Sequence, residues 1–192
     1  DNLEYAVLND DLERLESWLV YSWFLDAEYS INRGCIEFLA AKENRLEALR
    51  LILETTSNIN VTDASGQSLL FYAISKNNLE MMEYLLRKGI SPNKADNYGV
   101  TPLHEAVDYG NLDFVKSLLS KGANVGPVNI SGETALHNAA YLGDIAIIRA
   151  LLDKGANPKT KNLDGKTPRK VAKKSKHKAA AKYLKKAEKG KL

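Results

Sequence analysis

The sequence has a single cysteine, Cys35, so no disulfide can form within the chain. One thiol is typical of a protein in a reducing compartment, although it does not exclude export. No run of eighteen apolar residues occurs, so we expect no membrane-spanning helix. The first residue is Asp1 rather than Met, which indicates a fragment or a processed chain. The localisation therefore stays open, with the cytoplasm favoured.

The chain also lacks the residue sets that catalysis and metal binding require. Its carboxylates are scattered without the paired spacing of a general acid and base. The glycines occur singly at expected turns and form no phosphate-binding loop. His104 and His137 are 33 residues apart. If that spacing is one layer of packed helices, they lie about 10 Å apart, too far to share a metal ion. We therefore expect no catalytic residue, no cofactor and no metal.

What the sequence does contain is a pattern that recurs every 33 residues, clearest in residues 97–129. Thr101 stands where a helix N-cap is expected, and Pro102 follows at the first helical position. Apolar residues then recur at helical spacing in two short segments. Gly110 and Gly122 end these segments with residues that tolerate a left-handed backbone. The stretch predicts two short helices followed by an extended, turned segment.

Two helices of about ten residues each are marginal in water, so this unit needs neighbouring copies to bury its apolar face. The chain supplies them, because four aliphatic residues fall in register at the repeat spacing: Leu46, Leu79, Leu112 and Ile145. A fixed period with this punctuation is typical of a stacked repeat array. The spacing divides the chain into six units: 1–30, 31–63, 64–96, 97–129, 130–162 and 163–192.

Four short segments carry a family resemblance: TPLHEAV at 101–107, TALHNAA at 134–140, and KGAN at 121–124 and 154–157. They resemble ankyrin repeats, and the resemblance covers residues 31–162 continuously, with the flanks as degraded repeats. It implies an all-α repeat solenoid of about six helix–turn–helix–hairpin units, of which the first and last are atypical caps. It also implies that His104 and His137 hydrogen-bond backbone groups and tie neighbouring repeats together.

Several positions depart from the repeat pattern. Asn44 and Asn77 replace the glycine between the two helices, and we expect the turn to be kept because Asn tolerates a left-handed backbone. Lys176 occupies the same position in the last unit, where we expect an irregular turn. No glycine ends the second helix near Thr56, so an irregular end is expected there too. In residues 31–63, Cys35–Phe38 stand in place of the Thr-Pro-Leu-His segment, so that unit is degenerate.

The two terminal units differ from the rest in size and charge. In residues 1–30 we expect a long second helix, from about Asp11 to about Phe24. Its large side chains either cover the next repeat as a cap or anchor a partner: Trp18, Leu19, Trp23 and Phe24. In residues 163–192 we expect a final helix that frays from about Ala187. Its predicted inward-facing residues are Ala179, Ala180, Tyr183 and Leu184.

The net charge of +3 hides an asymmetry. Residues 163–192 hold twelve Lys or Arg and two Asp or Glu, whereas residues 1–162 hold fifteen and twenty-two. The basic end either keeps the last helix soluble or attracts nucleic acid, acidic lipid or an acidic protein. Its lysines are not interleaved with aromatic residues, which argues against specific nucleic-acid recognition. We therefore favour the solubility interpretation.

The repeat pattern leaves the turn tips and the exposed face of each first helix free to vary, and these line a concave side in such arrays. Tyrosines and aliphatic residues gather there with a polar rim, a composition typical of a binding hot spot. The predicted partner-binding residues are Lys76, Tyr98, Val100, Asp108, Tyr109, Ile130, Ser131, Glu133, Tyr141 and Leu142. The alternative is that exposed tyrosines are ordinary and the hairpin residues pack on each other.

These observations predict a monomeric, non-enzymatic module that binds a partner protein or peptide on its concave face. Two alternatives remain. The basic residues 163–192 could bind nucleic acid or an anionic surface, although nucleic acid is the less favoured partner. The chain could also be the recognition fragment of a larger enzyme or effector.

Overall fold

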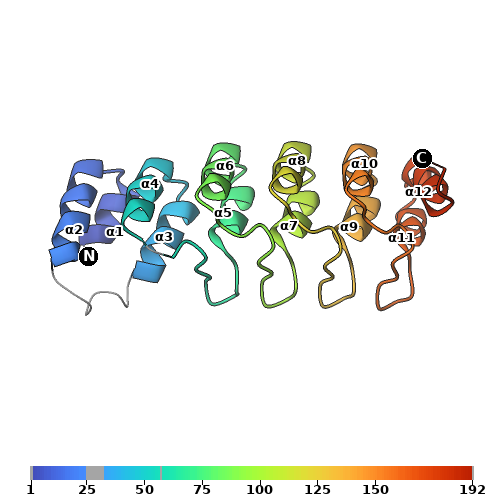
Figure 1. Ribbon diagram of the computed structural model, residues 1–192, viewed down its shortest axis with the longest axis horizontal. Helices are drawn as coiled ribbons and strands as arrows, with labels where there is room; N and C mark the ends of the chain where they lie inside the picture. Colours follow the sequence, from blue (N-terminus) through green and yellow to red (C-terminus); the bar gives the residue numbers. More distant parts are fainter. Residues whose placement is uncertain (1, 25–32, 57, 192) are drawn as a thin grey trace. The chain divides into compact units, whose positions relative to one another are not determined.

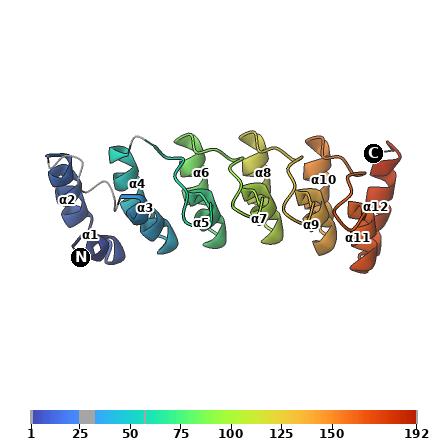
Figure 2. The same ribbon diagram turned by 90° about the horizontal axis from the view of Figure 1, so that it is seen from below.

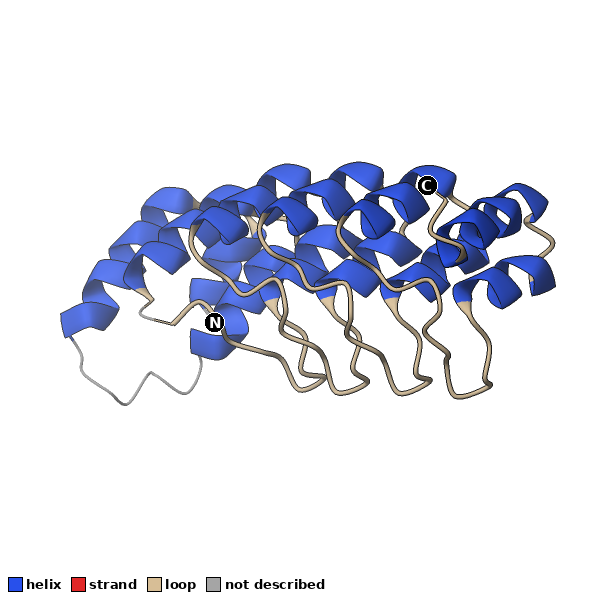
Figure 3. Ribbon diagram, turned by 45° about the vertical axis from the view of Figure 1, so that its right-hand side comes forward, coloured by secondary structure: helices blue, strands red, loops and turns tan. Residues whose placement is uncertain are grey.

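The computed structural model describes residues 2–24, 33–56 and 58–191. Two compact units make up the chain, Asp1–Ser91 and Pro92–Leu192, named unit 1 and unit 2 below. All regular secondary structure in the described residues is helical (Figure 3). The side chains of Trp23, Phe24 and Cys35 lie outside the described part. The role predicted for Trp23 and Phe24, to cover the next repeat or to anchor a partner, therefore stays a prediction.

Within its described residues, unit 1 holds three helix pairs: α1 (Asn2–Leu8) and α2 (Leu12–Phe24), α3 (Arg33–Lys42) and α4 (Leu46–Thr55), α5 (Leu69–Ser75) and α6 (Leu79–Arg87). The first helices of successive pairs contact each other, α1 with α3 and α3 with α5, and α2 contacts α4 (Figure 1). Arg50 of α4 also donates to Glu80 of α6 at 2.8 Å. The long second helix predicted for the first unit is present as α2.

Between residues 92 and 191, unit 2 holds three more pairs: α7 (Pro102–Asp108) and α8 (Leu112–Ser120), α9 (Ala135–Leu142) and α10 (Ile145–Asp153), α11 (Pro168–Lys174) and α12 (Lys178–Glu188). Helices α7, α9 and α11 form one layer, and α8, α10 and α12 form the other (Figures 1 and 2). Each predicted sequence unit contains one pair, while the boundaries between those units stay a prediction.

The core of unit 2 lies between these layers. The predicted stripe of the first helix is buried at Leu103, Ala106 and Val107, and the second helix buries Phe114 and Val115. Burying one such aliphatic or aromatic side chain contributes about 1.5–3 kcal/mol. Because each helix pair is too small to enclose these residues alone, the pairs are stable only when stacked.

A buried histidine joins each of two neighbouring helix pairs in unit 2 to the next hairpin. The Thr101 hydroxyl accepts from the His104 backbone N–H at 3.4 Å, and His104 Nδ1 accepts from the Thr101 N–H at 3.2 Å. His104 Nε2 therefore carries the proton and donates to the Glu133 carbonyl at 3.1 Å. His137 Nε2 lies 3.1 Å from the Lys166 carbonyl in the same way. The predicted tie between repeats is confirmed.

Each hairpin of unit 2 is closed by an Asp or Asn side chain at its root. Oδ1 of Asp96 accepts from the backbone N–H of Val100 at 2.9 Å, and Oδ1 of Asn162 accepts from that of Lys166 at 2.9 Å. Asn129 holds its hairpin in the same way. These residues stand 33 positions apart, so the repeat also fixes the turn chemistry.

Neighbouring hairpins of unit 2 are bonded to one another near their tips. The Ile130 N–H donates to the Tyr98 carbonyl at 2.9 Å, and the Leu163 N–H donates to the Ser131 carbonyl at 3.0 Å. Gly132 shows how close the approach is, because a Cβ there would lie 2.9 Å from the Leu163 nitrogen. The hairpin tips are therefore held in a fixed row.

The turns inside the helix pairs follow one geometry, with one departure from expectation. Asn44 and Asn77 have φ of 58° and 52°, which confirms that Asn keeps the left-handed turn. Lys176 also adopts a left-handed backbone, with φ of 65°. The irregular turn predicted there is wrong, because the His177 N–H still closes the turn on the Ala172 carbonyl at 2.9 Å.

The two predicted irregularities at helix ends have different outcomes. Helix α4 ends at Thr56 in an extended conformation, as the missing glycine predicts. Helix α12 runs to Glu188, whose carboxylate accepts from Arg169 at 3.1 Å, so the helix ends close to the predicted onset at about Ala187. The fraying of the last residues stays a prediction.

The inward face of α12 was predicted partly wrongly. Ala180 and Leu184 are buried as expected, and Tyr183 is half-buried. Ala179, however, is exposed, and Ala181 is buried in its place. An alanine-rich run carries little contrast between faces, so its helical phase cannot be fixed from composition.

The buried histidines predict a pH dependence of stability. Burial lowers the pKa of His104 and of His137, so the folded state binds fewer protons there than the unfolded chain. Their contribution to stability is present above the ordinary pKa of 6.5 and is lost as the pH falls below it. We expect a lower free energy of unfolding at pH 5.5 than at pH 7.5, measured by urea unfolding.

The control for this prediction replaces both histidines with glutamine, a variant that should be less stable and should lose the pH difference. Asp108 and Glu105 contribute with the opposite sign, because burial raises their pKa. Both carboxyls are kept in the histidine variant, so their effect is present in the wild type and in the control alike. A wild-type protein equally stable at both pH values would contradict the prediction.

A second prediction concerns the left-handed lysine. A left-handed backbone costs an L-residue about 1–2 kcal/mol, and glycine avoids this cost. The K176G variant should therefore raise the free energy of unfolding by about 1 kcal/mol. The matched control, K173G, lies inside α11 and should lower it by about 1 kcal/mol, because glycine is a poor helix former. Changes of the same sign in both variants would show that Lys176 carries no backbone strain that glycine relieves.

Candidate functional site

The first helices of unit 2 present one face to solvent, formed by α7, α9, α11 and the hairpins before them (Figure 2). We call it the inner-helix face. Because the helices repeat every 33 residues, equivalent positions form rows across this face. One row runs Asp108, Tyr141, Lys174, and a second runs Val100, Glu133, Lys166. The face is therefore a grid of equivalent positions filled by different side chains.

A groove of about 890 Å³ is open on this face. Its lining comes from α7, α9, α11 and the hairpins that lead into α9 and α11. Four of the predicted binding residues line it: Asp108, Glu133, Tyr141 and Leu142. Tyr141 is 65% exposed, so its ring stands free for contact with a partner. The predicted residues of α9, Tyr141 and Leu142, thus lie at one site with the predicted acids Asp108 and Glu133.

The remaining predicted residues lie elsewhere. Tyr98, Ile130 and Ser131 are exposed at hairpin tips, Val100 is half-buried, and Tyr109 is exposed at the end of α7. Lys76 is an exposed residue that follows α5 and belongs to unit 1. The structure therefore divides the predicted surface into a groove and a row of hairpin tips.

The row of hairpin tips contains a residue that sequence reasoning missed. Leu163 is 79% exposed, at the position equivalent to Ile130, which is 66% exposed. Tyr98 precedes them at 59%. The 33-residue register pointed to Leu163, but the prediction stopped at the last well-matched repeat. Tyr98 stands one position later in its own repeat, and the hairpins that carry the three side chains are hydrogen-bonded to each other.

One wall of the groove is acidic. Asp108 accepts a hydrogen bond from Asn138 Nδ2 at 2.8 Å, and Glu133 Oε1 accepts one from Asn162 Nδ2 at 3.0 Å. Burial raises the pKa of Asp108 despite the bond from Asn138, and the charge of Glu133 raises it further. Burial likewise raises the pKa of Glu105, with a smaller effect from Asp108. Among the described residues, no cation forms an ion pair with these three carboxylates.

The opposite wall is basic, and its residues belong to the lysine-rich end, for which sequence reasoning favoured a role in solubility over one in binding. Lys166, Lys174 and His177 line the groove from the last helix pair and its hairpin. Lys166 is paired with Asp164 beside it. Within the described part of the chain, Lys174 forms no ion pair, but its charge acts on Asp164, which also lines the groove. A prediction that treated the lysine run as one block could not separate this lysine from its neighbours.

The buried imidazoles of His104 and His137 are engaged by backbone groups on both ring nitrogens. Over the described ranges, no three His, Cys, Asp or Glu side chains gather closely enough to hold a metal ion. In those same ranges, no helix has the length and apolar content needed to cross a membrane.

Comparison with known proteins agrees with the repeat geometry. A search of the curated proteins finds no match. A family model described as ankyrin repeats (3 copies) matches residues 38–129 and again residues 123–191. Ankyrin repeats are generally protein–protein interaction modules and are typically non-enzymatic. The two matches cover most of the sequence and include every helix of unit 2. The chain belongs to the ankyrin repeat family.

Proposed function

We propose that this protein is a non-enzymatic binding module whose inner-helix face in unit 2 holds a partner protein or peptide. The observation that carries the proposal is the groove itself. Exposed Tyr141 and Leu142 line it together with charged residues on both walls. An aromatic anchor surrounded by polar groups is the usual composition of a binding hot spot.

The rigidity of the face supports this proposal. The hairpin roots are held by side-chain hydrogen bonds, and their tips are bonded to each other. The histidines tie each root to the helix pair before it. Binding to a surface that is already ordered costs little conformational entropy, so modest contacts suffice for useful affinity.

The proposal is tested with the double variant Y109A/Y141A, which removes two exposed aromatic rings from the face. We expect recovery of partner proteins from an extract of the source organism to fall about tenfold or more, since truncated aromatic hot spots cost about 2 kcal/mol or more each. Mass spectrometry of the captured proteins measures the change.

The matched control is Y5A, which removes an equally exposed tyrosine from α1 in unit 1. It should leave recovery unchanged. Thermal unfolding of all variants shows that folding is intact. Unaltered recovery by the folded double variant would reject the face as the binding site.

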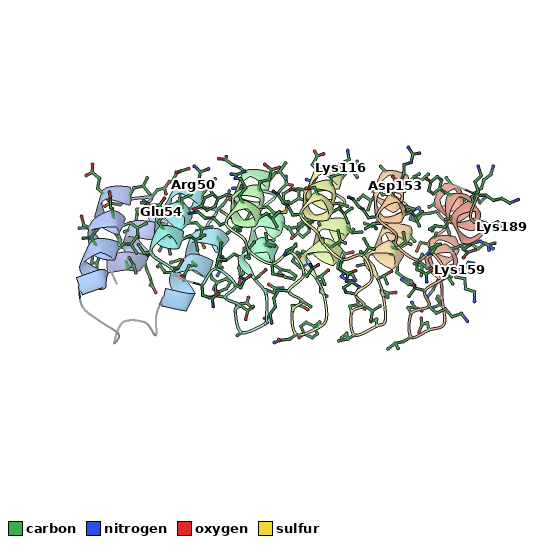
Figure 4. The ribbon with its side chains drawn as sticks, viewed as in Figure 1. Arg50, Glu54, Lys116, Asp153, Lys159 and Lys189 are labelled. Carbon is green, nitrogen blue, oxygen red and sulfur yellow. The ribbon has the colours of Figure 1, made fainter. Side chains whose placement is uncertain are left out.

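A second candidate function concerns α12. Its exposed lysines are Lys178, Lys182, Lys185 and Lys186, and exposed Lys189 follows the last residue of the helix (Figure 4). None of them forms an ion pair with a described residue. Glu188, the acid on this helix, is engaged by Arg169. This unbalanced helix supports binding to an anionic surface or to nucleic acid.

This second function predicts strong salt dependence. The affinity for single-stranded DNA, RNA or vesicles of acidic lipid should fall steeply with salt, with a log–log slope of about 0.7–0.9 per phosphate neutralised on a nucleic acid. Fluorescence anisotropy and vesicle sedimentation measure it. The variant K182Q/K185Q/K186Q should reduce the slope, and K116Q on α8 serves as the control. A flat salt response would remove this function.

A further inference from the structure

We propose that the groove recognises an extended segment with a fixed charge order: an arginine or lysine at one end, an apolar residue in the middle and an acidic residue at the other end. The inference rests on the proposed function and names the chemistry of its partner. It follows from the row Asp108, Tyr141, Lys174, which places an acid, an aromatic ring and a base on successive helices.

The acidic wall requires a cation from outside the described chain. Asp108 and Glu133 are held by amide groups, which satisfy hydrogen bonds without neutralising charge. The negative charges of the two carboxylates repel each other, and a cationic side chain placed between them offsets this repulsion. Arginine suits the site better than lysine, because its planar group can bond two acceptors and stack on the ring of Tyr141.

The basic wall requires the opposite charge. Lys166 is paired with Asp164, which also lines the groove and feels the charge of Lys174, so this wall holds two lysines for one acid. His177 packs closely against the end of α9, since a Cβ on Gly143 would clash with its ring. A carboxylate of the partner therefore meets a wall on the α11 side with one more ammonium group than carboxylates, together with one imidazole.

The geometry also sets the spacing of the two charges. Neighbouring packed helices are about 8–10 Å apart, so the two steps from α7 to α11 span about 20 Å. An extended chain rises about 3.3 Å per residue, so the two charges should be separated by about six residues. Tyr141 and Leu142 lie midway and receive the apolar residue. Nucleic acid fits this groove poorly, because Asp108 and Glu133 repel phosphate.

The test uses a displayed library of random twelve-residue peptides, selected on the full-length wild-type protein and on the charge swap D108K/K174E. Wild type should enrich peptides in which an arginine or lysine and an acidic residue stand about six positions apart. The swap should enrich the reversed order. The control swap K116E/D153K changes the same charges on α8 and α10, away from the groove (Figure 4), and should keep the wild-type order.

Single variants keep the test informative if the swap does not fold. A peptide selected on wild type should bind D108N and K174Q about tenfold more weakly or worse, the loss expected for one charge pair in an interface. Enriched peptides without a charge order, or the same order on wild type and the folded swap, would overturn the inference and leave the proposed function standing. No enrichment above bare support would overturn both.

Discussion

The hydrogen bond from a buried imidazole to the carbonyl of the next hairpin is the interaction on which the geometry of unit 2 depends. His104 closes its own helix start through one ring nitrogen and holds the Glu133 carbonyl through the other. The bond is made inside the protein, where an unpaired polar group costs about 1–3 kcal/mol. It therefore fixes how each helix pair meets the next hairpin, as well as adding stability.

The candidate site is a consequence of this regular stacking. The scaffold positions are filled by Thr, His and apolar residues that point inward, so the outward positions can differ from one repeat to the next. Asp108, Tyr141 and Lys174 occupy the same outward position on three helices, yet they differ in charge and in aromatic character. A uniform backbone thus presents a non-uniform surface, and this difference is what a partner can recognise.

Much of this architecture could be predicted from short-range patterns, because the period, the Thr caps and the turn residues are local signals. Leu163 and Lys174 were missed for a different reason. Their importance comes from neighbours a whole repeat or more away in the sequence, and it appears only when the hairpins and helices are placed side by side. The turn at Lys176 was mispredicted because residue preference argued against a conformation that closure of the helix pair imposes.

The bonded hairpin tips have a consequence for how such a surface can change. Ile130 and Leu163 each donate a backbone hydrogen bond to the preceding hairpin, so adding or removing a residue in one loop would break its match with the next. This scaffold therefore cannot vary by lengthening or shortening single loops, as antibodies do. New specificity must come from exchanging side chains on loops of constant length, so variants of this face differ by substitutions rather than by insertions or deletions.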